Sequence, residues 1–273
     1  MTFLIAASIC DAAALNIAGK LIDRYGFEKA EQYQNPAVAE VYSRNNILLA
    51  YIKEDSINAS RLDRAFEVEG IVFASRHKSE SSEPTLTVHV SGNPTSQASH
   101  GGRPQELAWA WPQRMRNALI KLEEAGGRLS QRYRVSMEAT HHGPTELRVP
   151  TWFVEIGSSE RYWNDDEAGM AVADAIWASL TQPLNGKSAV GFGGGHYAPK
   201  HTKYCIKGDL AIGHILPKYV FGNLKREVIA QTSAKTVGGC RVAVIDWKGI
   251  RGAERRTLLQ TLEELGVEEV ARI

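Results

Sequence analysis

The histidines are the residues whose type and position most directly indicate chemistry. Six of the eight lie beside expected strand ends or in glycine- and proline-rich turns: His77, His89, His141, His142, His196 and His214. Ligands of α/β sheets bind at strand ends and in the loops that follow them, so these six imidazoles are expected to converge. Taken singly, His77, His89 and His214 are more typical of hydrogen-bonded structural histidines. His100 and His201 lie in polar, loop-like surroundings, and no role is assigned to them.

The segment 138–146, EATHHGPTE, contains two carboxylates and two imidazoles within nine residues. Adjacent histidines on a straight strand face opposite ways. The turn at Gly143-Pro144 bends the chain and allows one or both to face a pocket that Glu146 also reaches. Imidazole with carboxylate is a ligand set for Zn²⁺, and equally a general base with its orienting partner. The plain alternative is a polar turn whose histidines cap backbone carbonyls, but a cluster in one loop favours a site.

The segment 191–200, GFGGGHYAPK, follows an apolar run and contains three consecutive glycines: Gly193, Gly194 and Gly195. Their N–H groups are free to face a phosphate, a carboxylate or a developing oxyanion. Neither the GxxxxGK[ST] nor the GxGxxG pattern is present, which removes support for nucleotide hydrolysis. A tight crossover that needs glycine only for packing is the alternative, and the adjacent His196 and Lys200 weigh against it.

Basic residues gather after this glycine-rich segment: Lys200, Lys203, Lys207, Lys218, Lys225 and Arg226. Such a run is usually a solvated face. If the pocket handles an RNA terminus, this patch is the one best placed to meet phosphates. Tyr197 or Tyr219 is then available to stack a base.

The elements that must position these residues follow from the pattern of apolar residues. Runs rich in β-branched residues alternate with stretches of helical period, which favours a layered α/β fold. Strands are predicted at 2–7, 47–52, 71–75, 86–90, 133–138, 152–156, 189–192 and 242–246, and helices beginning near 12, 61, 104, 165, 224 and 253. The helix from Pro104 is the clearest, and Gly126-Gly127 ends it. Without a repeat or linker, residues 1–273 are expected to form a single domain, with a long loop at 91–103.

Composition excludes several classes of protein. A net charge of +1 excludes a chain that holds nucleic acid through bulk positive charge, although a local basic face remains compatible with it. No apolar run approaches the roughly 18 residues of a membrane span. Three cysteines without CxxC spacing indicate neither a disulfide framework nor a thiolate zinc site. A reducing cytoplasm fits best.

Seven motifs run along the chain: 73–77 (FASRH), 89–93 (HVSGN), 138–147 (EATHHGPTEL), 153–160 (FVEIGSSE), 193–200 (GGGHYAPK), 213–219 (GHILPKY) and 246–249 (DWKG). In this order they closely resemble the archaeal and plant type of D-aminoacyl-tRNA deacylase over nearly the whole chain. The resemblance implies a hydrolase that cleaves the ester between a D-amino acid and the 3′-terminal ribose of tRNA. It also implies two zinc ions per subunit and a three-layer α/β/α phosphorylase/hydrolase-like core with a mixed sheet.

The resemblance and the residue chemistry together give the expected roles. The catalytic set is His142, Glu146, His196 and Glu138. The metal ligands are His77, His89, His141 and His214. The substrate-binding set is Gly193, Gly194, Gly195, Lys200 and Lys218. The expected partner is the 3′ acceptor end of D-aminoacyl-tRNA, without DNA or membrane, and mass and charge permit a monomer.

Two mechanisms stay open at this point. Zinc lowers the pKa of bound water from about 15.7 toward about 7. Alternatively, His142 or His196 acts as general base, Glu138 orients it, and glycine amides stabilise the oxyanion. The number of histidines favours the mechanism that uses zinc. The rivals are a zinc-dependent aminopeptidase or amidohydrolase with the same ligand set, and a non-catalytic module that binds the tRNA end.

Overall fold

The computed structural model describes residues 2–33, 35–80, 82–129 and 132–273. Its larger sheet is mixed. Strands β1, β4, β5 and β10 run parallel, β3 is antiparallel to β4, and β6 is antiparallel to β10. In spatial order its strands are β2 (Glu28–Lys29), β3 (Val38–Arg44), β4 (Ile47–Ile52), β1 (Phe3–Ser8), β5 (Gly70–Lys78), β10 (Thr151–Ser158), β6 (Thr85–His89) and β9 (Arg134–Met137).

The smaller sheet is parallel throughout. Its strands, in spatial order, are β12 (Leu210–Leu216), β11 (Lys187–Phe192), β13 (Val242–Ile245) and β14 (Glu269–Arg272). A separate pair, β7 (Gly92–Asn93) and β8 (Glu106–Leu107), brackets a long loop.

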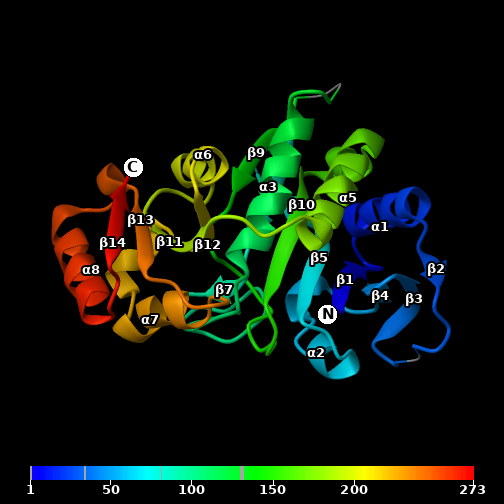
Figure 1. The fold of residues 1–273 in the computed structure, drawn as a ribbon, viewed down its shortest axis with the longest axis horizontal. Coiled ribbons are helices and arrows are strands. Elements are labelled where there is room, and N and C mark those ends of the chain that lie inside the picture. Colours follow the sequence, from blue (N-terminus) through cyan, green and yellow to red (C-terminus); the bar gives the residue numbers. More distant parts are fainter. Residues whose placement is uncertain (1, 34, 81, 130–131) are drawn as a thin grey trace.

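Helices cover both faces of each sheet (Figure 1). One face of the large sheet packs on α1 (Ala12–Tyr25), α3 (Pro112–Gly126) and α5 (Asp166–Thr181), and the other on η1 (Ser56–Asn58), α2 (Leu62–Ala65) and loops. The small sheet lies between α6 (Pro199–Lys207) on one face and α7 (Arg226–Ala234) with α8 (Gly252–Glu264) on the other. The short elements are α4 (Glu160–Trp163), η2 (Lys218–Asn223) and η3 (Trp247–Gly249).

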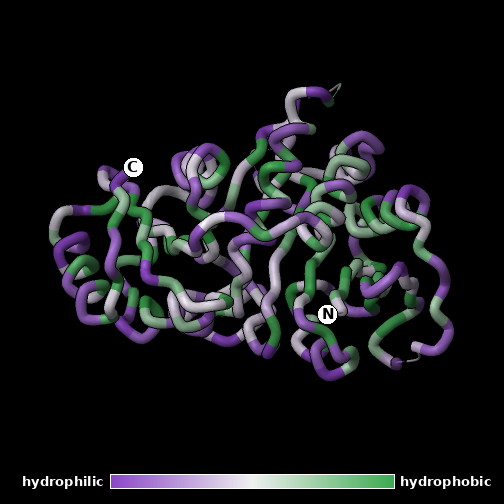
Figure 2. Tube along the Cα trace, in the orientation of Figure 1, coloured by the Kyte–Doolittle hydropathy of each residue, from purple (hydrophilic) through white to green (hydrophobic). Residues whose placement is uncertain are grey.

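One cluster of buried apolar side chains continues from the large sheet to the small one. It includes Ile5 of β1, Met115 and Leu119 of α3, and Ile212 of β12. Helix α3 therefore packs against both sheets and holds them in a fixed relation. Figure 2 shows the hydrophobic residues concentrated on the inner strands and the hydrophilic ones on outer turns.

The expected α/β class, with a mixed sheet between helical layers, is confirmed, and each of the eight predicted strands is present. The start of the third predicted helix is wrong. It begins at Pro112 rather than at Pro104, because Gln105 has a φ of 56° and Glu106 pairs in β8. Helix α6 was not predicted, and it places His201 in the buried interior rather than in a polar loop.

None of the helices in the described part of the chain combines the length and apolar character that a membrane crossing requires.

Candidate functional site

The register of three neighbouring strands brings a carboxylate and two imidazoles onto one face of the large sheet. Glu155 of β10 lies opposite Ser75 of β5 and opposite Thr87 of β6. Side chains alternate between the two faces of a strand, so the residues two positions further along, His77 and His89, point to the same face as Glu155. All five side chains are buried.

A short antiparallel contact between two loops places Glu138 beside His196. Glu138 follows β9 of the large sheet and bridges to Tyr197, which follows β11 of the small sheet. The Ala139 N–H donates to the His196 carbonyl at 2.8 Å. The two sheets are thus joined directly at the site.

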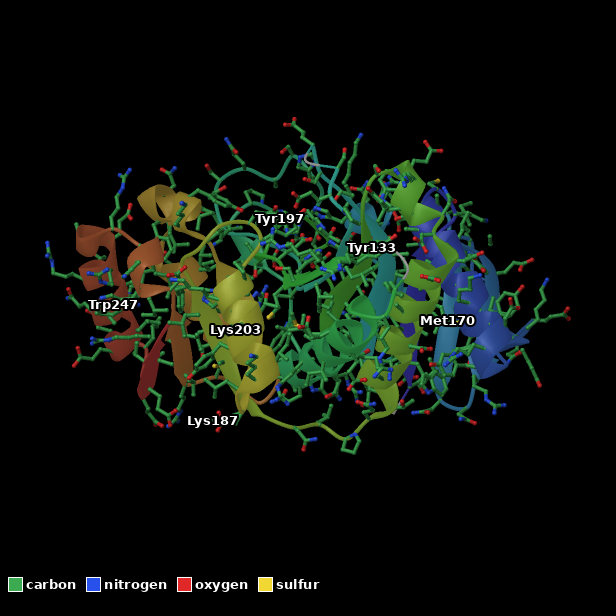
Figure 3. All side chains as sticks on the ribbon, turned by 90° about the horizontal axis from the view of Figure 1, so that it is seen from above. Tyr133, Met170, Lys187, Tyr197, Lys203 and Trp247 are labelled. Atoms are coloured by element: carbon green, nitrogen blue, oxygen red, sulfur yellow. The ribbon has the colours of Figure 1, made fainter. Side chains whose placement is uncertain are left out.

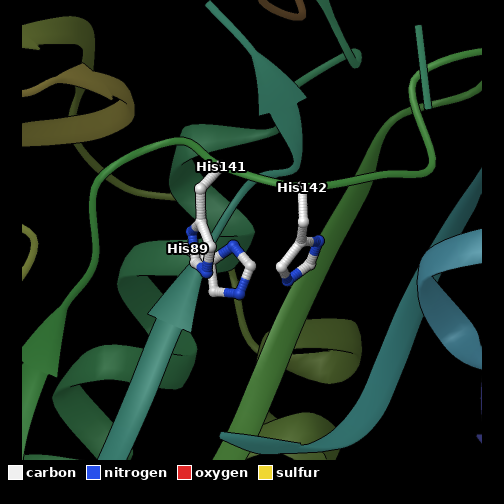
Figure 4. Close-up of side chains that lie close together, drawn as sticks. All are labelled: His89, His141 and His142. Carbon is white, nitrogen blue, oxygen red and sulfur yellow. The ribbon is translucent and has the colours of Figure 1, made fainter. Parts of the chain in front are cut away.

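His141 and His142 reach the site from the turn that follows β9. The backbone of His141 bridges to Ser91, and the Gly92 N–H donates to the His142 carbonyl at 2.7 Å. His142 has a φ of 45°, in the left-handed region that residues other than glycine rarely adopt. Figure 4 shows the result: both rings lie beside that of His89, with centroids 4.4 and 4.8 Å from it.

Glu138 is the centre of the cluster. Its Oε1 lies 3.1 Å from His77 Nδ1, and its Oε2 lies 3.1 Å from His196 Nε2 and 3.6 Å from His141 Nε2. Burial alone raises the pKa of a carboxyl group, but His196 and His77 outweigh this effect and hold the pKa of Glu138 well below its ordinary value. The cluster therefore contains a buried negative charge.

Glu155 is a second buried carboxylate. Its Oε2 lies 3.5 Å from His89 Nε2 and 3.7 Å from His77 Nδ1, and Thr87 Oγ1 donates to it at 3.4 Å. Burial opposes ionisation here too, but His89 and His77 lower the pKa of Glu155 to about 2. Conversely, burial lowers the pKa of His77, and the two carboxylates reverse this and raise it to about 11.

His141 and His142 present free ring nitrogens to the cluster. His141 Nδ1 lies 2.8 Å from the Ala139 carbonyl oxygen, and His142 Nδ1 lies 2.6 Å from that of Gly143. A carbonyl oxygen only accepts, so each Nδ1 carries the hydrogen and each Nε2 keeps its lone pair. Burial lowers the pKa of His142 to about 4 and that of His141 well below its ordinary value. A histidine that donates its other N–H to a carbonyl is typical of metal ligands.

The cluster faces a cavity of about 770 Å³. Its walls come from β5 and β10 of the large sheet, from the turn after β9, from the loop between β7 and β8, from His196 after β11, and from η2. The members of the cluster that line it are His77, His141, His142, His196 and Glu155. This volume lies in the range of pockets that enclose drug-sized ligands.

Three overlapping groups of side chains have the make-up of a metal site. In each group one ligand atom per residue lies within 4.8 Å of the others: His89–His141–His142, His77–Glu138–His196 and His89–Glu138–Glu155. Both ring nitrogens of His89 and both carboxylate oxygens of Glu138 are buried without a well-aligned hydrogen bond to any described residue. Buried polar atoms normally have partners, and Zn²⁺ takes nitrogen and oxygen ligands of these kinds. The residues therefore fit zinc.

His214, predicted as a metal ligand, is in none of the metal-ligand groups formed by the described residues. It lies on β12 of the small sheet and is fully buried. Its Nδ1 is 3.4 Å from Thr140 Oγ1, and burial lowers its pKa to about 4. The physical reason for the separation is that β12 turns this ring into closed packing instead of toward the cavity.

Glu146, predicted as catalytic, also lies apart from the cluster. Its Oε2 accepts from the Thr145 N–H at 2.9 Å, and its Oε1 lies 3.9 Å from Arg103 Nε. The turn that brings His141 and His142 inward carries Glu146 beyond the cavity wall. Its contacts hold this turn against the loop between β7 and β8.

Four of the five predicted substrate-binding residues make contacts within the fold. The Gly193 N–H donates to the Leu216 carbonyl at 2.8 Å, and the Gly194 carbonyl accepts from the Lys218 N–H at 3.0 Å. Lys200 Nζ lies 2.6 Å from Asp246 Oδ1. Within the described ranges, none of the five predicted residues lines the cavity: Gly193, Gly194, Gly195, Lys200 and Lys218.

No role was predicted for Glu155, and Tyr197 was predicted only as a residue that could stack a base. A carboxylate in the middle of the apolar strand 152–156 was the available signal for Glu155, since a buried charge needs a partner. The Tyr197 hydroxyl lies 2.8 Å from His77 Nε2, across 120 residues of sequence. No local pattern indicates a contact of this kind.

The fold and the site together describe an α/β protein with a cavity lined by histidines and carboxylates, the side chains that hydrolytic enzymes use. Residues 64–270 match the family described as D-aminoacyl-tRNA deacylase. D-aminoacyl-tRNA deacylases of Pyrococcus furiosus and Thermococcus kodakarensis are 41% and 42% identical to the chain over 264 and 268 residues, in each case 94% of this chain and 95% of the relative.

A crystal structure of a conserved protein of unknown function superposes on the chain with a TM-score of 0.91 and 33% sequence identity, covering 99% of this chain and 95% of the other. The chain belongs to the D-aminoacyl-tRNA deacylase family. The family predicted from the seven motifs is confirmed.

Proposed function

We propose that this protein hydrolyses the ester between a D-amino acid and the 3′-terminal ribose of tRNA, and that zinc held in the cluster is required. The observation that carries the proposal is the convergence of imidazoles and carboxylates from both sheets at a cavity of about 770 Å³. Membership of the family supports the choice of substrate.

Two groups of ligands share no residue and would each hold one ion. The first is His89, His141 and His142, and the second is His77, Glu138 and His196. Zinc bound there supplies Lewis acidity, which makes water more acidic and polarises an ester carbonyl. Glu138 and Glu155 are ionised, and their two negative charges would offset part of the positive charge of bound ions.

The chain's own residues have three tasks in this reaction. The Nδ1 bonds to backbone carbonyls fix the rings of His141 and His142 with their lone pairs toward the cluster. The Tyr197 hydroxyl orients His77 through its Nε2. The walls of the cavity hold the ester so that water adds to the carbonyl carbon, the bond to the ribose oxygen breaks, and that oxygen takes up a proton.

A metal-free route uses the same residues. His196 Nε2 lies 3.1 Å from Glu138 Oε2, and about a third of the His196 side chain is exposed to the cavity. This is the arrangement of a general base with its orienting carboxylate. In this route His196 takes a proton from water and returns it to the leaving ribose oxygen.

Hydrolysis of matched D- and L-aminoacyl-tRNAs tests the proposal. We expect wild-type protein to release the D-amino acid preferentially, and His142→Ala to lose most of this activity. His100→Ala is the matched control, because His100 lines the cavity outside the three ligand groups of the described residues. Equal turnover of D and L substrates, or none, contradicts the proposal.

Chelation separates the two routes. Exhaustive treatment with a chelator is expected to abolish turnover, and added zinc is expected to restore it. Full activity in protein verified to be free of metal contradicts the zinc requirement and leaves the His196–Glu138 route.

The rival functions predict different results. A zinc aminopeptidase or amidohydrolase hydrolyses small peptides whether or not tRNA is present. A binding module retains deacylated tRNA and turns over nothing. Peptidase activity that excess tRNA does not inhibit would favour the first.

We also propose that residues 1–273 act as one monomeric domain in the cytoplasm. The apolar cluster shared by the two sheets and the three free cysteines, Cys10, Cys205 and Cys240, support this. A single cooperative unfolding transition and a sedimentation mass of one chain are expected. Two separate transitions or a dimer mass would contradict it.

A further inference from the structure

Tyr219 is the most exposed large hydrophobic residue in the described part of the chain, with 59% of its surface accessible. It lies in η2 and lines the same cavity as the histidine cluster. Its hydroxyl and its ring make no hydrogen bond or ring contact with any described residue. Packing therefore does not explain why an aromatic ring stands at the edge of a polar cavity.

The backbone under Tyr219 is firmly held although the ring is free. Val220, the next residue, is buried in the core between the small sheet, α7 and α8. Lys218, the residue before, donates its N–H to the Gly194 carbonyl at 3.0 Å. Gly193 and Gly194 have φ values of 89° and 80°, which favour glycine at both positions. The glycine-rich segment thus positions η2 and holds the backbone of Tyr219 at the cavity.

Tyr197, the other tyrosine expected to stack a base, is already engaged in contacts with other side chains. Its hydroxyl lies 2.8 Å from His77 Nε2, and its ring lies beside the guanidinium of Arg134. In Figure 3 it lies between the small and large sheets. A base cannot displace it without disturbing His77, whereas stacking on Tyr219 breaks no contact among the described residues.

The ester of an aminoacyl-tRNA ends in a nucleoside, so a group with two flat π faces must sit near the reacting carbonyl. Successive bases stack on aromatic side chains in proteins that bind single-stranded RNA. Another part of the cavity wall comes from β5 of the large sheet and includes Lys78, whose side chain is exposed. Its positive charge is available to the phosphate next to the terminal nucleoside. An aromatic face together with a cation suits a nucleotide ligand better than an apolar ligand.

We propose that Tyr219 is the stacking platform for the terminal nucleobase of the tRNA substrate. This inference rests on the proposed function. Stacking stabilises the enzyme–substrate complex and the transition state to the same degree. Its loss therefore raises KM and leaves kcat nearly unchanged.

Kinetics on Tyr219 variants test the inference. Tyr219→Ala is expected to raise KM for D-aminoacyl-tRNA by roughly 5- to 150-fold, the range for the loss of one base–aromatic stack. Tyr219→Phe keeps the ring and is expected to restore KM. Tyr33→Ala is the matched control, because Tyr33 is also exposed but lies outside the cavity lining. A D-aminoacyl ester of glycerol, which has no base, is expected to react equally with wild type and Tyr219→Ala.

Binding of deacylated tRNA, measured by fluorescence titration, gives a readout that does not depend on turnover. The same fold increase in Kd is expected for Tyr219→Ala. An unchanged Kd and KM in Tyr219→Ala, or failure of Tyr219→Phe to restore them, overturns the stacking role. Absence of turnover in wild type, with deacylated tRNA still bound in a Tyr219-dependent way, overturns the proposed function instead.

Discussion

Two pairs of histidines are buried to a similar extent but lie in opposite electrostatic surroundings. His77 and His89 lie beside the carboxylates of the cluster, and these charges outweigh burial, so that the pKa of His77 rises to about 11. His201 and His214 are fully buried among apolar side chains and backbone, and burial lowers the pKa of each to about 4.

Burial acts in the same direction on both pairs, so neighbouring charge makes the difference. The first pair lies within 3.1 to 3.7 Å of carboxylate oxygens of Glu138 and Glu155, and this negative charge suits cation binding. In the packed pair, His201 Nε2 lies 3.2 Å from the Val244 carbonyl and His214 Nδ1 lies 3.4 Å from Thr140 Oγ1, and no described carboxylate forms an ion pair with either ring. The carboxylates beside His77 and His89 therefore distinguish this pair from the packed pair.

The largest expected effect comes from removing the charge that distinguishes the two pairs. Glu138→Gln keeps the size of the side chain and removes the charge shared by His77, His141 and His196. We expect kcat to fall roughly 10²- to 10⁴-fold, the span that positioned acid–base groups contribute. Deacylation under single-turnover conditions measures it.

Glu146→Gln is the matched control, since it changes the other carboxylate of the same segment, which lies apart from the cavity. Its kcat is expected to stay within about threefold of wild type. Equal losses in the two variants would show that the cluster is not the reacting centre.

The packed pair predicts an acid-dependent stability that does not involve catalysis. Below pH 6.5 the unfolded chain binds a proton at His201 that the folded chain excludes until about pH 4. The free energy of unfolding therefore falls as pH drops through this window, by on the order of 3 kcal/mol from this group, and levels off below it.

His201→Leu removes this titration. Urea unfolding at several pH values between 7 and 4 is expected to show wild type losing on the order of 3 kcal/mol relative to the variant. The folded His201→Leu variant is expected to keep nearly wild-type activity at pH 7. A pH-independent difference between the two proteins would contradict the assignment of a buried neutral imidazole.

A smaller effect on kcat is expected from removing the Tyr197 hydroxyl, which orients His77. Tyr197→Phe removes one hydrogen bond, worth about 0.5–1.5 kcal/mol, and should lower kcat roughly 2- to 13-fold and shift its pH profile. Tyr25→Phe removes a similar bond, to Asp174, away from the cavity. If the two variants have the same kcat and pH profile, Tyr197 has no positioning role.

Most of the fold was predictable because its strands are apolar and bounded by turns. Strand β12 was not predicted because Gly213 and His214 interrupt its apolar run. Strand β14 was not predicted because none of its residues is buried, so that it carries no apolar pattern. Both strands pair with a neighbour in the small sheet, β12 with β11 and β14 with β13, and this pairing stabilises them.

The histidines of the site were predictable from type and motif, but their partners were not. Glu138 and Glu146 flank the same two histidines and are equivalent by local sequence. The bridge between Glu138 and Tyr197, a contact between the two sheets, brings only one of them to the cluster. Glu155 depends in the same way on the register of three strands. Contacts of this range are set by topology and have no local pattern.

Zinc bound per chain tests the central claim most directly. It is measured by mass spectrometry of the metal in wild type, His89→Ala and His214→Asn after exhaustive dialysis against buffer with trace zinc. The account predicts two ions in wild type, a loss in His89→Ala, and the wild-type content in His214→Asn. Wild-type protein without zinc, or loss in His214→Asn with full content in His89→Ala, would contradict it.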